Sequence, residues 1–271
     1  MKITRFEHGD YAGWGVVEAD HVLPLPGARH YGEALALASS ADASTGVPRE
    51  QVRWLPPVQP DTKIICVGLN YRKHAREAGH DVSLYPSVFP RFPDSFVGHD
   101  EAVVRSRLSE TLDYEAELAV VIGKTARHVQ ADEAMAYVGG YTCMAENSVR
   151  DYQMHNRQAT PGKNFERSGA LGPWIVPATP LGDPRDVRVI GRLNGEEVQN
   201  GGLDELVFSV PALVAYLSAF TTLRPGDIIA TGTPDGVGMT QAPPRFLRAG
   251  DIFEVEVTGV GVLRHAVMQE D

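Results

Sequence analysis

The stretch Asp113–Lys124 reads DYEAELAVVIGK, and the interpretation of the whole chain starts from it. Its second half, Glu117–Gly123, is an apolar run after the leading acid, which predicts a buried β-strand. Residues two apart on a strand point to the same face, so Glu115 and Glu117 are expected to project together. Two such carboxylates repel each other unless a cation lies between them, and oxygen ligands suit Mg²⁺, Mn²⁺ or Ca²⁺ rather than zinc. The stretch therefore predicts a candidate divalent-metal site, with a solvated strand edge as the alternative.

Further apolar runs predict more strands. Lys63–Gly68 (KIICVG) and Asp227–Thr231 (DIIAT) have the continuous apolar pattern of buried strands. Asn194-Gly195 supplies the positive φ values of a type I′ turn, so Val187–Leu193 and Glu196–Gln199 are expected to form a hairpin.

Helical periodicity is confined to a few segments. Asp132–Val138 is one of them, and Ser209–Thr221 is the clearest. Strands and helices do not alternate regularly, which excludes a doubly wound sheet and favours an α+β class dominated by β-structure. Near the start, short strands and a helix over Tyr31–Ser39 precede the chain breakers Pro56-Pro57 and Pro60. We therefore expect a small N-terminal α/β domain over residues 1–58 and a larger domain over residues 59–271.

Composition limits the classes of function. The chain has 271 residues, with 25 Lys and Arg against 35 Asp and Glu, for a net charge of −10. A general nucleic-acid binder needs a basic face, so this acidic balance argues against one. No signal peptide and no apolar run of spanning length is visible. Cys66 and Cys143 lie in apolar runs and are expected to be buried and reduced. We expect a cytoplasmic protein with a small-molecule partner and no nucleic-acid or membrane partner.

Three other segments carry chemically useful side chains. His74 and Glu77 are three residues apart in a predicted helix after Lys63–Gly68, where the carboxylate would orient the imidazole as a general acid or base. Lys163 lies in a polar loop, and the glycine- and threonine-rich loop Thr231–Gly238 follows a predicted strand. Taken singly, each has a simpler explanation: a surface His–Glu pair, a solvated lysine and a connecting loop.

In combination, these segments resemble the fumarylacetoacetate hydrolase family in its short, acylpyruvate hydrolase-like form. The matching stretches are Ile64–Glu77, Asp113–Lys124, Val138–Gln153, Gly162–Phe165, Leu171–Val176 and Phe208–Gly238. The resemblance spans residues 60–271 and implies a mixed β-roll with few helices. It also implies a homodimer that binds Mg²⁺ or Mn²⁺ (Ca²⁺ is possible) through three carboxylates and acts on 2-oxo acids.

The resemblance assigns roles to individual residues of this chain. Glu115, Glu117 and Glu146 match the metal ligands; His74, Glu77 and Lys163 match the catalytic residues; and Tyr71, Gln153 and Thr233 match residues at the substrate. One position departs from the family pattern, because Glu146 stands where an Asp is usual. Its extra methylene must be accommodated if the oxygen–metal bond is to stay at about 2.0–2.1 Å.

The function that the resemblance implies is hydrolysis of the C–C bond of a 2,4-dioxo acid, such as an acylpyruvate or fumarylpyruvate, to pyruvate and a carboxylic acid. Two alternatives on the same scaffold stay open: decarboxylation of oxaloacetate, and hydration or isomerisation of an unsaturated 2-oxo diacid from aromatic catabolism. A third alternative, of another class, is a non-catalytic protein that binds metal and oxo acid.

Overall fold

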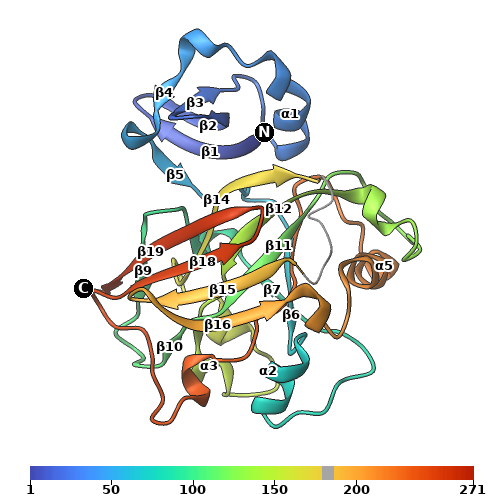
Figure 1. Cartoon of the computed structure of the whole chain (residues 1–271), viewed down its shortest axis with the longest axis vertical. Helices are drawn as coiled ribbons and strands as arrows, with labels where there is room; N and C mark the ends of the chain where they lie inside the picture. The colour runs from blue at the N-terminus through green and yellow to red at the C-terminus, as the bar shows by residue number, and fades with distance from the viewer. Residues whose placement is uncertain (179–185) are drawn as a thin grey trace.

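The computed structural model describes residues 1–178 and 186–271 and has the β-dominated α+β fold that the sequence predicts (Figure 1). The strands of the first half are β1 (Lys2–His8), β2 (Tyr11–Glu18), β3 (His21–Pro24), β4 (Val47–Pro48), β5 (Arg53–Leu55), β6 (Ile64–Gly68), β7 (Ser87–Arg91), β8 (Phe96–Val97), β9 (Ala102–Arg105) and β10 (Leu112–Asp113). Those of the second half are β11 (Ala116–Ile122), β12 (Val138–Ala145), β13 (Ser148–Val149), β14 (Gly169–Pro177), β15 (Arg188–Leu193), β16 (Glu196–Gly202), β17 (Ile228–Ala230), β18 (Ile252–Val257) and β19 (Gly261–Gln269). The α-helices are short: α1 (Tyr31–Leu37), α2 (Arg72–Glu77), α3 (Arg150–Gln153), α4 (Thr160–Lys163) and α5 (Val210–Phe220).

Within the described residues, most strands belong to one mixed sheet in the order β4-β3-β2-β1-β14-β12-β11-β17-β6-β7. Its centre, β11 and β12, is buried at every position, which explains why most residues of these strands are apolar or small. A second sheet, β16-β15-β18-β19-β9, packs against this centre, and its strands alternate buried and more exposed residues. The two sheets enclose the larger hydrophobic core.

The predicted hairpin at Asn194-Gly195 is confirmed. Its two turn residues have φ values of 54° and 82°, as a type I′ turn requires, and β15 pairs antiparallel with β16. The prediction of α5 is also confirmed, with Ser209 as the residue before the helix. The sequence also suggests a short helix over 132–138, but the structure has only a 3-10 helix over Ala134–Tyr137, because β12 begins at Val138.

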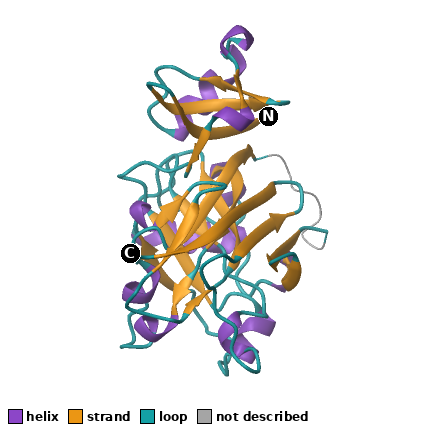
Figure 2. Cartoon of the chain, turned by 90° about the vertical axis from the view of Figure 1, so that its left-hand side faces the viewer, coloured by secondary structure: helices purple, strands orange, loops and turns teal. Residues whose placement is uncertain are grey.

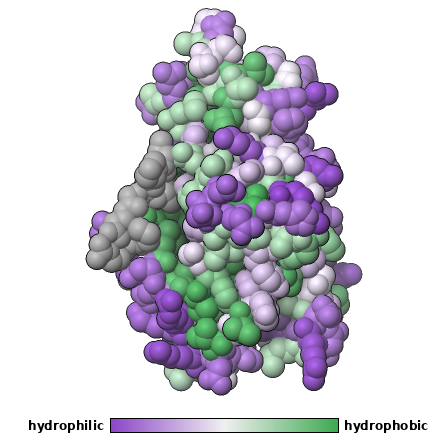
Figure 3. Space-filling model, turned by 90° about the vertical axis from the view of Figure 1, so that its right-hand side faces the viewer, coloured by the Kyte–Doolittle hydropathy of each residue, from purple (hydrophilic) through white to green (hydrophobic). Residues whose placement is uncertain are grey.

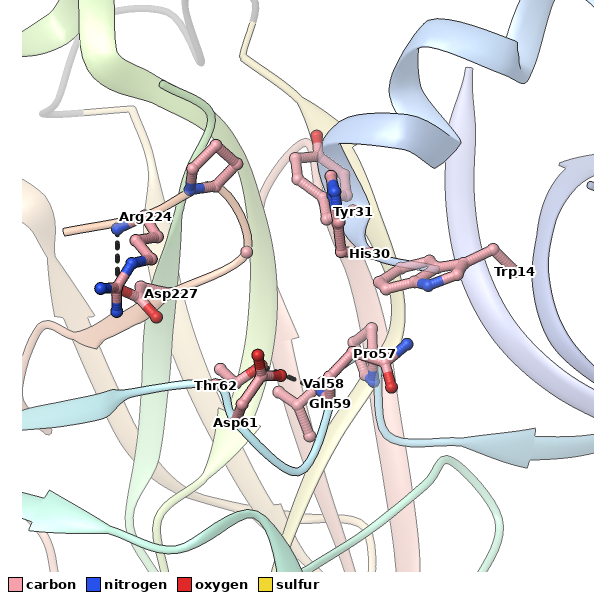
Figure 4. Close-up of a pocket in the computed structure, with 12 residues that line it drawn as sticks. Trp14, His30, Tyr31, Pro57, Val58, Gln59, Asp61, Thr62, Arg224 and Asp227 are labelled. Atoms are coloured by element: carbon pink, nitrogen blue, oxygen red, sulfur yellow. Dashed lines mark hydrogen bonds between the residues drawn. The ribbon is translucent and has the colours of Figure 1, made fainter. Parts of the chain in front are cut away.

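The N-terminal strands and α1 form a lobe at one end of the molecule (Figures 1 and 2). This lobe is not a separate sheet: Ile3 of β1 pairs with Ile175 of β14, which extends the main sheet into the lobe. At the junction, a cavity of about 340 Å³ lies between Trp14, Tyr31, Pro57 and the turn at Pro225 (Figure 4). The division at residues 58 and 59 stays a prediction.

Exposed apolar side chains gather on the side of the molecule that carries α5 (Figure 3). The segment after α2 contributes Leu84 and Tyr85, and the end of α5 contributes Phe220. The rings of Tyr85 and Tyr216 stack with centroids 6.4 Å apart, which joins the two segments. None of the helices described is long and apolar enough to cross a membrane. Cys66 and Cys143 are buried free thiols, as predicted.

Candidate active site

Four strands bring the predicted site residues to one edge of the main sheet. β6 and β17 run parallel, so α2 and the loop 231–240, which follow them, leave the sheet at the same edge. β11 runs antiparallel to β17 and therefore begins at this edge, where Glu115 and Glu117 lie. β12 ends beside the start of β11, and the amide of Glu146 donates to the carbonyl of Glu115. Residues that are far apart in the sequence thus meet because of strand direction.

Glu115, Glu117 and Glu146 form a buried cluster, with one carboxylate oxygen of each within 4.8 Å of the others. The oxygens are unequally satisfied. Ser148, Arg150 and Lys163 all donate to Oε1 of Glu115, at 2.6, 2.7 and 2.9 Å. Oε2 of Glu117 accepts from the amide of Gly232 at 2.8 Å.

These contacts separate the acidities of the three carboxyl groups. Burial favours the neutral form of Glu115, but the positive charges of Lys163 and Arg150 hold its pKa well below the usual value. Burial raises the pKa of Glu117 well above the usual value, and repulsion by Glu146 and Glu115 adds to that rise. Burial and Glu115 likewise raise the pKa of Glu146, although Lys163 opposes them.

The cluster fits a divalent cation. No described residue donates a hydrogen bond to Oε2 of Glu115 or to Oε1 of Glu117, although both side chains are almost completely buried. Three carboxylates packed this closely repel each other, and oxygen-only donors suit Mg²⁺ or Mn²⁺. The predicted ligands Glu115, Glu117 and Glu146 therefore lie where one ion could be bound.

Lys163 lies inside the cluster, at the end of α4, and is almost completely buried. Its ammonium group donates to Glu115 at 2.9 Å and also contacts Oε2 of Glu146. Burial alone would lower the pKa of Lys163, but the carboxylates of Glu115 and Glu146 raise it above the usual value. The charged form of this lysine is therefore favoured beside the carboxylates.

His74 and Glu77 lie on one face of α2, as the spacing predicts, with Nδ1 of His74 2.9 Å from Oε1 of Glu77. The carboxylate is also held by the loop after β17, because the amide of Gly236 donates to it at 3.1 Å and Thr240 Oγ1 at 3.2 Å. Burial opposes ionisation of Glu77, but His74 and Gly236 bring its pKa below the usual value. An ionised Glu77 orients the imidazole and leaves Nε2 for proton transfer.

The three residues expected at the substrate have different surroundings. The hydroxyl of Tyr71 is buried and has no hydrogen-bond partner in the described part of the chain. Gln153 is half-buried, and its Oε1 accepts from Arg150 at 2.9 Å. Thr233 donates its hydroxyl to the carbonyl of Ala116 at 2.9 Å, so this hydroxyl is already engaged. Among these three residues, Tyr71 is thus the one with a buried polar atom that has no partner in the described part of the chain, and all three roles stay predictions.

Sequence reasoning missed three buried side chains that hold this arrangement together. Arg150 bridges Asp113 at 2.8 Å and Glu115 at 2.7 Å. Arg91 donates to Oε1 of Glu146 at 2.9 Å. Gln199 donates to Thr233 at 2.7 Å and accepts from the amide between the first two glutamates at 2.9 Å. Only Arg150 had a local signal, because it lies in the segment that contains Glu146.

Two family matches cover almost the whole chain. Residues 63–268 match the family described as Fumarylacetoacetate (FAA) hydrolase C-terminal, and residues 1–57 match the one described as Rv2993c-like, N-terminal. Among curated proteins, the mitochondrial oxaloacetate tautomerase Fahd2a of Rattus norvegicus is 42% identical over 223 residues. The matched region covers 82% of this chain and 71% of the rat protein.

Solved structures of related enzymes have the same fold. A 5-carboxymethyl-2-hydroxymuconate delta-isomerase from Mycobacterium smegmatis is 29% identical with a TM-score of 0.82, and the match covers 100% of both chains. Fumarylpyruvate hydrolase from Pseudomonas aeruginosa, solved with Mn²⁺ and pyruvate, is 34% identical with a TM-score of 0.70 over 79% of this chain and 91% of that chain. Because the first family match covers most of the sequence and the rat relative exceeds 40% identity over most of it, this chain belongs to the fumarylacetoacetate hydrolase family.

Proposed function

We propose that this chain is a divalent-metal-dependent enzyme that hydrolyses the C–C bond of a 2,4-dioxo acid to pyruvate and a carboxylic acid. The observation that carries the proposal is the pairing of His74 with Glu77 at the sheet edge that holds the three buried glutamates. The His74–Glu77 pair is suited to activating water, and the three glutamates are suited to holding a cation beside the substrate.

The chain's own residues supply the proton transfers. Glu77, fixed by Gly236 and Thr240, holds Nδ1 of His74, so that Nε2 can take a proton from water. The water then attacks the carbonyl at C4 of the substrate, and the C3–C4 bond breaks. The electron pair of that bond leaves as the enolate of pyruvate, which is protonated at carbon to give pyruvate.

Negative charge develops on the 2-oxo oxygen when the enolate forms, and the site has means to stabilise it. Glu115, Glu117 and Glu146 would hold Mg²⁺ or Mn²⁺, which when bound supplies Lewis-acid stabilisation of that charge. Lys163 adds a buried positive charge beside two of the same carboxylates, those of Glu115 and Glu146. Stabilisation of developing charge by groups already in position is the largest single contribution in many enzymes.

The identity of the rat relative favours a second candidate, keto–enol tautomerisation of a 2-oxo diacid such as oxaloacetate. This reaction also passes through the enolate of a 2-oxo acid, here that of the diacid itself. A proton moves between C3 and the 2-oxo oxygen, no water attacks and no C–C bond breaks. Decarboxylation of oxaloacetate and isomerisation of an unsaturated 2-oxo diacid also pass through such an enolate, and a non-catalytic role stays the alternative of another class. Assembly as a homodimer and a cytoplasmic location remain predictions.

The test is a turnover screen with metal-stripped protein to which Mg²⁺ or Mn²⁺ is returned. Acylpyruvates, fumarylpyruvate and oxaloacetate are supplied, while loss of the dioxo or enol absorbance and formation of pyruvate are followed together. We expect metal-dependent release of pyruvate from an acylpyruvate, reduced in His74→Ala by about 10²–10⁴-fold because a general base has been removed. Metal affinity should persist in this variant.

His30→Ala is the matched control. His30 also faces a glutamate three residues on, Glu33, at 3.4 Å, but it is the N-cap of α1 in the N-terminal lobe. This variant should turn over like the unmodified chain. If enol oxaloacetate decays and no pyruvate forms, the assigned activity changes from hydrolysis to tautomerisation. Equal turnover in His74→Ala and the unmodified chain would refute the role of the dyad.

A further inference from the structure

The structure assigns a positioning role to Arg91, a residue at the end of β7 that the proposed reaction does not use directly. We propose that Arg91 fixes the carboxylate of Glu146 toward the other two glutamates and thereby sets the affinity of the site for its cation. This inference rests on the proposed function, because it takes the three-glutamate cluster as a metal site.

Arg91 is one of the most deeply buried charged residues, with 2% of its surface exposed. Its guanidinium donates through Nη1 to Oε1 of Glu146 at 2.9 Å and to the carbonyl of Asn147 at 3.0 Å. Nη2 donates to Ser168 at 3.0 Å, and Nε donates to Ser95 at 3.2 Å. With each of its nitrogens bonded, the guanidinium is held rigidly where it meets Glu146.

The ring of Phe96 also packs against the guanidinium group. The guanidinium carbon of Arg91 lies 4.3 Å from the ring centroid, so the flat group is packed from one side while its edges make hydrogen bonds. A planar guanidinium with several donors in a fixed fork suits this setting, whereas a lysine offers a single point charge on a flexible stem.

The contact determines which oxygen of Glu146 faces the cluster. Oε1 is occupied by Arg91, and Oε2 is the oxygen that contacts Lys163. A glutamate has one more side-chain torsion than the aspartate that the family resemblance leads one to expect, so it has more orientations to lose when it binds an ion. Arg91 removes that freedom before the ion arrives, and partners that orient a ligand in this way typically change metal affinity by about 10–100-fold.

Arg91→Lys tests the proposal, because it keeps the positive charge but replaces the fixed fork of donors by a flexible ammonium group. The full-length chain is stripped with a chelator, and Mn²⁺ alone is titrated by calorimetry. We expect one ion per chain in the unmodified protein and an affinity about 10–100-fold weaker in Arg91→Lys. Arg192→Lys is the matched control, since Arg192 pairs with Glu256 at 2.8 Å in a partly exposed position away from the cluster, and its affinity should be unchanged.

A double-mutant cycle shows whether Arg91 acts through Glu146. Glu146→Asp withdraws the carboxylate from Arg91 by one methylene and should also weaken Mn²⁺ binding. Both substitutions break the same contact. The double variant should therefore bind Mn²⁺ with about the affinity of whichever single variant binds it less tightly. Losses that multiply would overturn the proposal, because they would mean that the two residues act independently.

Thermal unfolding of the metal-free proteins checks that each variant is still folded. If Arg91→Lys does not unfold cooperatively, Ser168→Ala is the deciding variant. It removes the 3.0 Å hydrogen bond of Nη2 of Arg91, leaves Nη2 only its 3.5 Å contact with the carbonyl of Ser95, and changes no charge. It should weaken Mn²⁺ binding a few-fold. If a folded variant binds Mn²⁺ with unchanged affinity, the role of Arg91 is refuted but the metal site is not. If the unmodified chain does not bind Mn²⁺, the metal site of the proposed function is itself refuted.

Discussion

At the scale of single residues, His265 on β19 gives the fold a pH dependence through a group that takes no part in the proposed reaction, although its Nε2 lies 3.4 Å from Nδ2 of Asn147, the residue after Glu146. Its ring is fully buried, and burial lowers its pKa to about 4, although a hydrogen bond to the carbonyl of Ala266 opposes the shift. The pKa in the unfolded chain is about 6.5, so the unfolded state binds the extra proton between pH 6.5 and 4. Stability is therefore present above pH 6.5 and is lost as the pH falls toward 4. Between pH 7.5 and pH 5, this one group should lower the free energy of unfolding by about 2 kcal/mol.

His265→Gln should remove this contribution, because glutamine does not titrate. The free energy of unfolding is measured in urea at pH 7.5 and at pH 5. Its decrease between the two pH values should be about 2 kcal/mol smaller in the variant than in the unmodified chain. His8→Gln, at the exposed end of β1, is the control and should change the pH dependence little. Parallel losses in His265→Gln and the unmodified chain would show that His265 is not the group responsible.

At the scale of elements, the loop 231–240 after β17 orients three carboxylates at once. Its amides donate to Glu117 from Gly232, to Glu77 from Gly236 and to Asp113 from Gly238. Gly236 has a φ of 100°, and a Cβ placed there would come within 2.1 Å of the carbonyl oxygen of Val198. Gly236→Ala must therefore displace the loop from β16 and weaken its contact with Glu77. We expect kcat to fall by at least about tenfold, since a general base is worth about 10²–10⁴-fold when correctly held.

Gly250→Ala is the control for backbone strain alone. Gly250 has a similar φ of 92°, but a Cβ there would meet nothing within 4 Å. This variant should lose about 1–2 kcal/mol of stability, the usual cost of a left-handed conformation for a side chain, and keep its kcat. Equal kcat values in the two variants would mean that the loop does not set the position of Glu77.

The elements also show which features could be predicted from the sequence. The hairpin at Asn194-Gly195 and the shared face of Glu115 and Glu117 depend on residues that are neighbours in the chain, so periodicity and turn chemistry predict them. Arg91 reaches Glu146 across 55 residues, and Gln199 reaches Ala116 across 83. Such contacts follow from strand order and register, which no local pattern encodes. The family resemblance supplied the remaining site residues because it carries that tertiary information.

At the scale of the whole molecule, the N-terminal lobe shares a hydrophobic core with the rest of the chain. Ile3 and Trp14 of the lobe pack in one cluster with Val121 and Ile175 of the main sheet. The hydroxyl of Tyr31 donates to the carbonyl of Gly139 at 2.8 Å, across the same junction. Elements that share a core lose their packing together, so we expect the metal-free chain to unfold in one thermal transition rather than two.

Tyr31→Phe tests this coupling, because it removes one hydrogen bond across the junction. The amide of Ala178 also donates to the Gly139 carbonyl at 2.9 Å, so that carbonyl stays paired and the loss should be only about 1 kcal/mol. In a cooperative chain of this size, the single transition should move down as a whole by about 2–4 °C. Tyr85→Phe, at an exposed tyrosine, should leave it unmoved. If calorimetry instead resolves two transitions and Tyr31→Phe moves only one of them, the lobe folds on its own and the shared core does not couple it to the site.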